Sequence, residues 1–137
     1  MNDTMTTIQE VSKIIGASAK RLAQFELHQE DDAPSLRPMC PTRWTVRLRT
    51  LQSVATNLKA IVLTLLEVGH DQAGRESSIK AHGLLKHMET FEFVFGMELC
   101  MLIFGYTDEL SSTLQSSALG LDDAVPHVSL SSREIIY

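Results

Sequence analysis

The chain has 137 residues, which is enough for one domain with a modest core but short for an enzyme whose cleft lies between two lobes. Its composition, 44% hydrophobic and 21% charged, is typical of a soluble globular protein. The net charge of −5 is unevenly distributed, because residues 33–66 hold five bases and no acid. This basic segment can face a phosphate backbone or the acidic remainder of the same chain.

The N-terminal residues carry neither a basic region nor an apolar run, so we expect no secretion signal. We expect residues 1–6 to be disordered. The two cysteines, Cys40 and Cys100, indicate free thiols in a reducing compartment, and a single disulfide between them is the alternative.

Apolar residues recur every three or four positions along three segments, which predicts helices. The first predicted helix runs from Ile8 to Gln29, with a bend expected between Gly16 and Ser18 because glycine weakens a helix. The second runs without interruption from Trp44 to Val68 and ends at Gly69.

The third pattern begins at Ser77 or Ser78 and continues to Leu114, which is long for a single helix in a globular domain. We therefore expect a kink between His87 and Phe91. Beyond this pattern we expect a frayed tail over residues 126–137. The sequence predicts an all-α fold of three or four long antiparallel helices, in a helical region that spans residues 7–125.

The segment from Phe91 to Tyr106 is apolar on more than one side, so we expect it to be covered on both sides. Glu92 and Glu98 interrupt it, which argues against a membrane span. Such a stripe is more typical of a core or a partner interface than of a cofactor site. The predicted partner is therefore a second copy or another helical protein, with no membrane. The candidate interaction residues are Phe91, Phe93, Phe95, Leu102, Phe104 and Tyr106.

A second candidate site lies between Pro38 and Thr50, where arginines surround the only tryptophan. Two prolines favour an extended approach, after which Thr42 can cap a helix. In one interpretation Trp44 is simply the first core residue of that helix and the arginines are its solvated side. In the other, the guanidinium groups bind an anion and the tryptophan offers a face for stacking. The candidate nucleic-acid-binding residues are Arg37, Arg43, Trp44, Arg47 and Arg49.

The patterns of enzymes and metalloproteins are not found in this sequence. His82 and His87 are five positions apart, so they occupy poorly matched faces of a helix, and neither cysteine has a partner at ligand spacing. The chain has no glycine-rich phosphate loop and no nucleophile elbow. We therefore predict no enzymatic activity, no metal and no cofactor.

The residues from Pro38 to Arg47 read Pro-Met-Cys-Pro-Thr-Arg-Trp-Thr-Val-Arg. This segment resembles the Cys-Pro-Thr-Arg-Trp motif of hAT-superfamily transposases and of host proteins derived from them, such as the zinc-finger MYM-type group. Less specific likenesses extend the resemblance over residues 7–125. It implies a fragment of the helical insertion that splits the ribonuclease H-like catalytic domain of these transposases.

In that family the Arg-Trp pair lies near the active site and the transposon-end DNA, so the resemblance implies that Arg43 and Trp44 lie close to DNA. The chain lacks the segments that carry the family's two aspartates and glutamate, and catalysis would require another chain to supply three carboxylates. The resemblance therefore predicts a non-catalytic interaction fragment in the nucleus, or otherwise in the cytoplasm, that associates through apolar helices. The alternatives are a nucleic-acid-binding module built on residues 37–49 and a remnant without a selected role.

Overall fold

The computed structural model describes residues 2–37, 44–72 and 74–116. These residues form helices and connecting loops, and no strand occurs within the three ranges. The all-α class predicted from the sequence is thereby confirmed. The prediction of three or four helices is wrong, because six are present in the described ranges: α1 (Asn2–Gly16), α2 (Ala19–His28), α3 (Trp44–Thr56), α4 (Leu58–His70), α5 (Arg75–Met88) and α6 (Phe91–Gln115).

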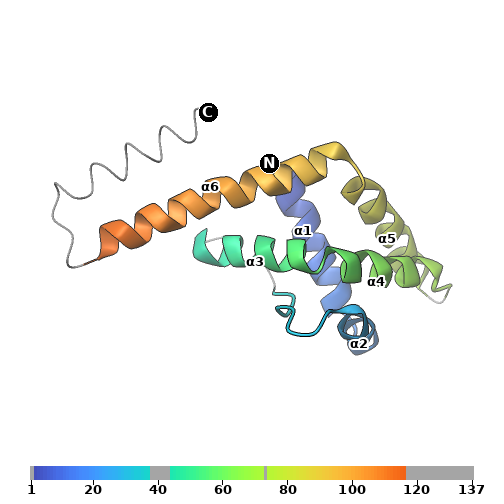
Figure 1. The fold of residues 1–137 in the computed structure, drawn as a ribbon. Helices are drawn as coiled ribbons and strands as arrows, with labels where there is room; N and C mark the ends of the chain where they lie inside the picture. Colours follow the sequence, from blue (N-terminus) through green and yellow to red (C-terminus); the bar gives the residue numbers. More distant parts are fainter. Residues whose placement is uncertain (1, 38–43, 73, 117–137) are drawn as a thin grey trace.

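The helices surround α1, which contacts α2, α4, α5 and α6 (Figure 1). Helix α6 runs along one side of the molecule, and α3 and α4 follow one another beneath it. Helix α3 packs against α6, while α4 packs against α2 and α5. Ile8, Val11 and Ile15 of α1 are almost completely buried, as are Leu51 of α3 and Ile61 of α4. The core therefore lies around α1, and α6 covers one side of it.

The first break, between α1 and α2, lies where the sequence predicts it. Helix α1 ends at Gly16, and Ser18 has extended backbone angles (φ −143°, ψ 132°) before α2 begins. The start of α1 differs from the expectation of disorder over residues 1–6. The helix begins at Asn2, and Thr4 is buried beneath α6. Packing against the rest of the chain thus extends this helix beyond its apolar pattern.

The second break corrects the prediction of one continuous helix from Trp44 to Val68. The chain bends by 73° between α3 and α4, at Asn57. The buried Asn57 amide donates to the carbonyl oxygens of Pro34 (2.7 Å) and Ser53 (2.8 Å), and its side-chain oxygen accepts from Gln29 (2.9 Å). These bonds attach the segment after α2 to the bend. Helix α4 then continues through the expected end at Gly69 and stops one residue later.

The third break confirms the kink expected between His87 and Phe91. Helix α5 ends at Met88, and Thr90 caps α6. The Thr90 hydroxyl accepts from the Phe93 N–H (3.3 Å) and donates to the His87 carbonyl (2.7 Å). One side chain thus satisfies backbone groups of both helices.

In the described part of the chain, no single helix is long and apolar enough to cross a membrane. Helices α3 and α4 reach that length and composition only when they are taken together across their bend.

Candidate interaction surface on helix α6

Helix α6 has 25 residues, and its inner face supplies much of the core. Phe93, Met97, Cys100 and Phe104 are all buried, with at most 6% of any of these residues exposed. Phe93 also meets the His87 ring edge to face, with 5.9 Å between the ring centroids. This face follows the ordinary rule for a core helix, with apolar residues three or four positions apart.

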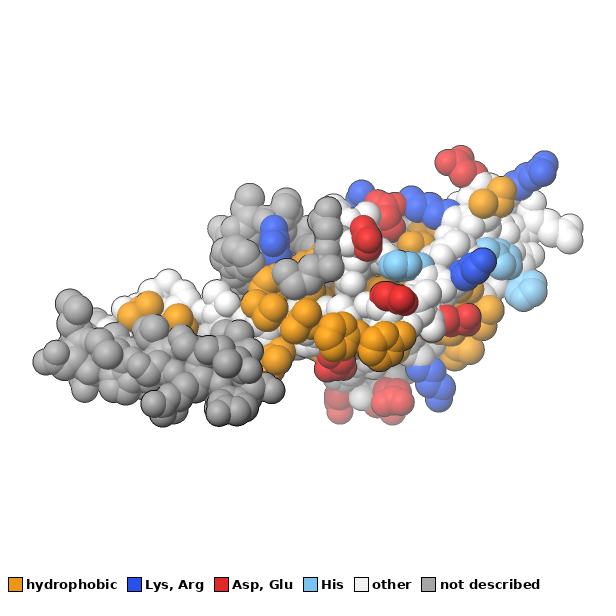
Figure 2. Space-filling model, turned by 90° about the horizontal axis from the view of Figure 1, so that it is seen from above, with side chains coloured by type: hydrophobic (Ala, Val, Ile, Leu, Met, Phe, Trp, Pro, Cys, Tyr) orange, Lys and Arg blue, Asp and Glu red, His pale blue; other side chains and the backbone are white. Residues whose placement is uncertain are grey.

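The outer face of α6 is also apolar, but the described part of the chain leaves much of it exposed. Phe91 is 76% exposed, Phe95 55% and Leu102 51%. The rings of Phe91 and Phe95 stack on each other, with centroids 5.6 Å apart and planes 17° from parallel. Figure 2 looks onto this side of the molecule and shows a row of apolar side chains along α6 with acidic side chains beside it. Exposed aliphatic and aromatic side chains in a contiguous row are characteristic of interaction sites.

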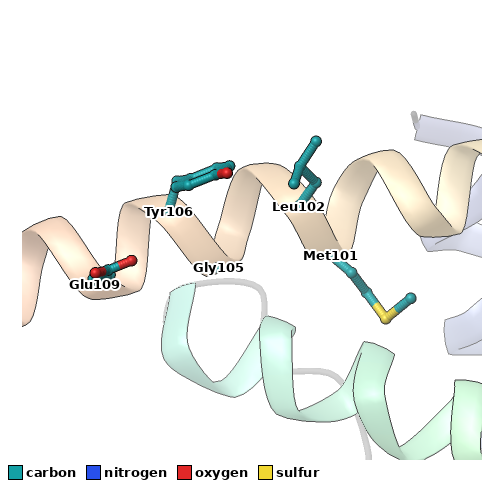
Figure 3. A pocket seen from close by; sticks show the side chains of 5 residues that line it. All are labelled: Met101, Leu102, Gly105, Tyr106 and Glu109. Atoms are coloured by element: carbon teal, nitrogen blue, oxygen red, sulfur yellow. The ribbon is translucent and has the colours of Figure 1, made fainter. Parts of the chain in front are cut away.

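A shallow hollow continues this row toward the C-terminal half of α6 (Figure 3). Its volume is about 290 Å³, and it is lined by Met101, Leu102, Gly105, Tyr106 and Glu109. Met101 points toward α3, whereas Leu102 and Tyr106 project away from it. A Cβ atom placed on Gly105 would meet no atom within 4 Å. The missing side chain of Gly105 therefore leaves room that the described residues do not fill.

The structure divides the six aromatic and aliphatic residues that the sequence identifies as candidate interaction residues. Phe91, Phe95 and Leu102 lie on the exposed face, and Tyr106 lines the hollow. Phe93 and Phe104 belong to the buried core, so they do not form part of the exposed surface. The sequence predicts that both apolar sides of α6 are covered. The described part of the chain instead covers one face of this helix and leaves the other exposed.

The arginine segment is described only in part. Arg43 lies outside the described residues, as does the side chain of Trp44, with which α3 begins. Arg37 and Arg49 line one groove of about 220 Å³, together with polar residues of α3 and the segment before it. Arg47 is half-buried and is not among the residues that line this groove. The structure therefore brings together two of the five predicted nucleic-acid-binding residues.

Within residues 2–37, 44–72 and 74–116, no group of three or more His, Cys, Asp or Glu side chains is placed to hold a metal ion. Comparison of the chain with protein-family models, curated proteins and solved structures found no match. The resemblance to hAT transposases accordingly stays a prediction from the sequence.

Proposed function

We propose that the chain is a non-catalytic helical module that associates with another helix through the outer face of α6. Its origin as a fragment of a domesticated or truncated hAT-type transposase, and its place in the nucleus, are proposed from the sequence resemblance alone. The observation that supports association is the row formed by Phe91, Phe95 and Leu102, each more than half exposed beside a well-buried inner face. Burial of a large apolar side chain contributes about 1.5–3 kcal/mol, so covering this row favours a complex before the cost of association is subtracted.

The test uses a designed, uncharged helical peptide with a leucine stripe and glutamine at the other positions. We expect fluorescence anisotropy to show binding to the full chain, and Phe95→Gln with Leu102→Gln to weaken it at least about tenfold, since two buried apolar contacts are lost. Leu27→Gln with Ile79→Gln is the matched control, because both residues are exposed and lie on α2 and α5. Equal binding to all three proteins would contradict the proposal.

A second candidate function is binding of nucleic acid, and the shared groove of Arg37 and Arg49 favours it. Residues 33–66 contain no acid, so no carboxylate of this segment opposes a phosphate there. Loss of two phosphate contacts reduces the salt dependence of single-strand DNA binding by roughly 0.7 per contact. We expect that reduction for Arg37→Ala with Arg49→Ala, and none for Arg75→Ala with Lys86→Ala on α5. An unchanged slope in the first variant would eliminate this candidate.

A further inference from the structure

The outer face of α6 contains two sets of four residues with the same spacing, i, i+3, i+4 and i+7. The first set is Phe91, Val94, Phe95 and Glu98, and the second is Leu102, Gly105, Tyr106 and Glu109. Four residues at these positions form the diamond-shaped hole that receives one side chain of a partner helix in knobs-into-holes packing. The second set also lines the hollow of Figure 3, where Gly105 has no side chain to fill the hole.

The two holes are related by a shift of eleven residues, which is about 16 Å along the helix axis. Eleven residues make three turns at 3.67 residues per turn, close to the natural period of an α-helix. Both holes therefore lie on one face with little drift between them. A partner helix with apolar side chains at the same eleven-residue repeat can fill both at once. The spacing favours a helix over an extended strand, whose side chains on one face recur about every 7 Å.

The charges of α6 distinguish among the possible partner helices. All four charged residues of α6 are acidic: Glu92, Glu98, Asp108 and Glu109. In the described part of the chain, none of the salt bridges involves an acid of this helix. Each hole ends on a glutamate, at Glu98 and Glu109, and both glutamates are exposed.

A second copy of α6 is a poor match for this face, because acids would meet acids whether the two helices ran parallel or antiparallel. Like charges that meet across an interface weaken binding, whereas opposite charges accelerate association and fix the register of the two helices. Residues 117–137 hold three acids and one base, so their net charge opposes this face as well. A partner helix with lysine or arginine beside its apolar stripe would satisfy both the holes and the glutamates.

We propose that the occupant of the α6 outer face is a basic amphipathic helix of another protein. Its apolar side chains, eleven residues apart, fill the two holes, and its flanking cations pair with Glu98 and Glu109. This inference deepens the proposed function and depends on it.

The probes are three fluorescent peptides of about 22 residues that share one leucine stripe with the eleven-residue repeat. Their flanking positions carry lysine, glutamine or glutamate. We expect the lysine peptide to bind at least about tenfold more tightly than the glutamate peptide at 50 mM NaCl. We expect the difference to shrink by 500 mM NaCl, because salt screens exposed charges.

Two variants connect the preference to α6. Glu98→Lys with Glu109→Lys should reverse the order of the lysine and glutamate peptides, whereas Glu26→Lys with Glu30→Lys, the same charge change elsewhere, should retain it. Gly105→Gln should weaken the lysine peptide about tenfold by filling the second hole. Because a side chain at Gly105 meets no neighbour in the described part of the chain, this variant should keep the unfolding midpoint of the wild type or exceed it.

The outcomes separate the two proposals. If the glutamine peptide binds through Phe95 and Leu102 but the lysine and glutamate peptides bind equally, the inference about charge fails and the proposed function stands. Self-association in light scattering that is lost in Phe95→Gln with Leu102→Gln would make a second copy the occupant and overturn the inference. If no peptide binds and the chain is monomeric, both proposals fail.

Discussion

Gly96 of α6 lies so close to Thr4 of α1 that a Cβ atom on this glycine would overlap the Thr4 hydroxyl oxygen. Both residues are buried. Thr4 stands near the start of α1, and Gly96 is in the second turn of α6. The absence of a side chain at Gly96 therefore allows α1 and α6 to approach each other, which positions the N-terminal half of the α6 outer face.

We expect Gly96→Ala to destabilise the protein by about 1–3 kcal/mol, because a methyl group forced into a packed contact requires the helices to separate. Urea unfolding followed by circular dichroism measures the change. The double variant Thr4→Ala with Gly96→Ala removes the overlapping hydroxyl. We expect it to be more stable than the sum of the single changes predicts by about 1 kcal/mol. Additive effects would show that the two residues are not in contact.

Gly105 on the same helix provides the opposite case. A Cβ atom there meets nothing within 4 Å, so Gly105→Ala should stabilise the protein by about 0.5–1 kcal/mol through the helix propensity of alanine. The same urea unfolding experiment checks it. If the Gly105→Ala protein is less stable than the wild type, another part of the same chain occupies the hollow beside Tyr106.

These two glycines show what the sequence can and cannot predict. Glycine is a weak point in any helix pattern, yet Gly16 ends a helix while Gly96 and Gly105 lie within one. The breaks at Gly16 and at Thr90 follow from local residues, so they were predictable. The bend at Asn57 was not, because the apolar pattern continues through it and the stabilising hydrogen bonds come from Gln29 and Pro34, far away in the chain.

The candidate site could be predicted in the same partial way. The clustering of aromatic residues predicts an interaction segment between Phe91 and Tyr106, but periodicity cannot say which of two apolar faces the rest of the chain covers. Only the packing of α1 and α3 against α6 assigns Phe93 to the core and leaves Phe91 exposed. The eleven-residue relation between the exposed sets is visible in the sequence once that face is known.

The bend between α3 and α4 depends on the three hydrogen bonds of the Asn57 side chain. Asn57→Leu keeps a similar size but removes all three bonds, and the Pro34 carbonyl then accepts only from Gln29 (3.2 Å) and Ser53 (3.5 Å). We expect a loss of about 2–4 kcal/mol, since a typical hydrogen bond contributes about 0.5–1.5 kcal/mol net and three are removed. Chemical unfolding measures the loss. Gln52→Leu, on the exposed side of α3, is the control and should change stability by less than about 0.5 kcal/mol.

An ion pair between Glu10 and Lys80 joins α1 to α5 and makes the stability of the folded chain depend on pH. Its carboxylate accepts hydrogen bonds from Lys80 and from Lys13 (2.9 Å), and these bonds, led by Lys80, hold the pKa of Glu10 below its ordinary value. A carboxyl whose pKa is lower in the folded state adds stability above its unfolded pKa. That stability disappears as pH falls from the unfolded pKa, about 4.3, through the folded pKa.

We therefore expect Glu10→Gln to be less stable than the wild type at pH 7 by a few tenths of a kcal/mol, the usual scale for a partly exposed ion pair. The difference should shrink as the pH falls from the unfolded pKa through the lower folded pKa of Glu10. Chemical unfolding of both proteins between pH 3 and 7 measures it. Glu26→Gln is the control, because it makes the same change at an exposed acid of α2 that forms none of the ion pairs among the described residues. A Glu10→Gln deficit that persists unchanged at acid pH would assign it to packing instead of charge.

Cys100 reports on whether the inner face of α6 stays covered. The residue is only 1% exposed, and burial raises the pKa of its thiol because the apolar surroundings disfavour the thiolate. Iodoacetamide reacts with the thiolate form of a cysteine. At pH 8 it should therefore alkylate Cys100 at least about a hundredfold more slowly in the folded chain than in the urea-unfolded chain. A Cys40→Ser background leaves this thiol as the single target, and mass spectrometry follows the modification.

Two variants serve as controls. Because Phe95→Gln changes only the outer face of α6, we expect the same slow modification of Cys100 in that variant. Gly96→Ala should accelerate the modification, because it separates α6 from α1. Rapid modification of the folded Cys40→Ser protein would show that α6 is not packed against α1 and α3 in solution. Helix α6 would then have no covered face to distinguish from an exposed one.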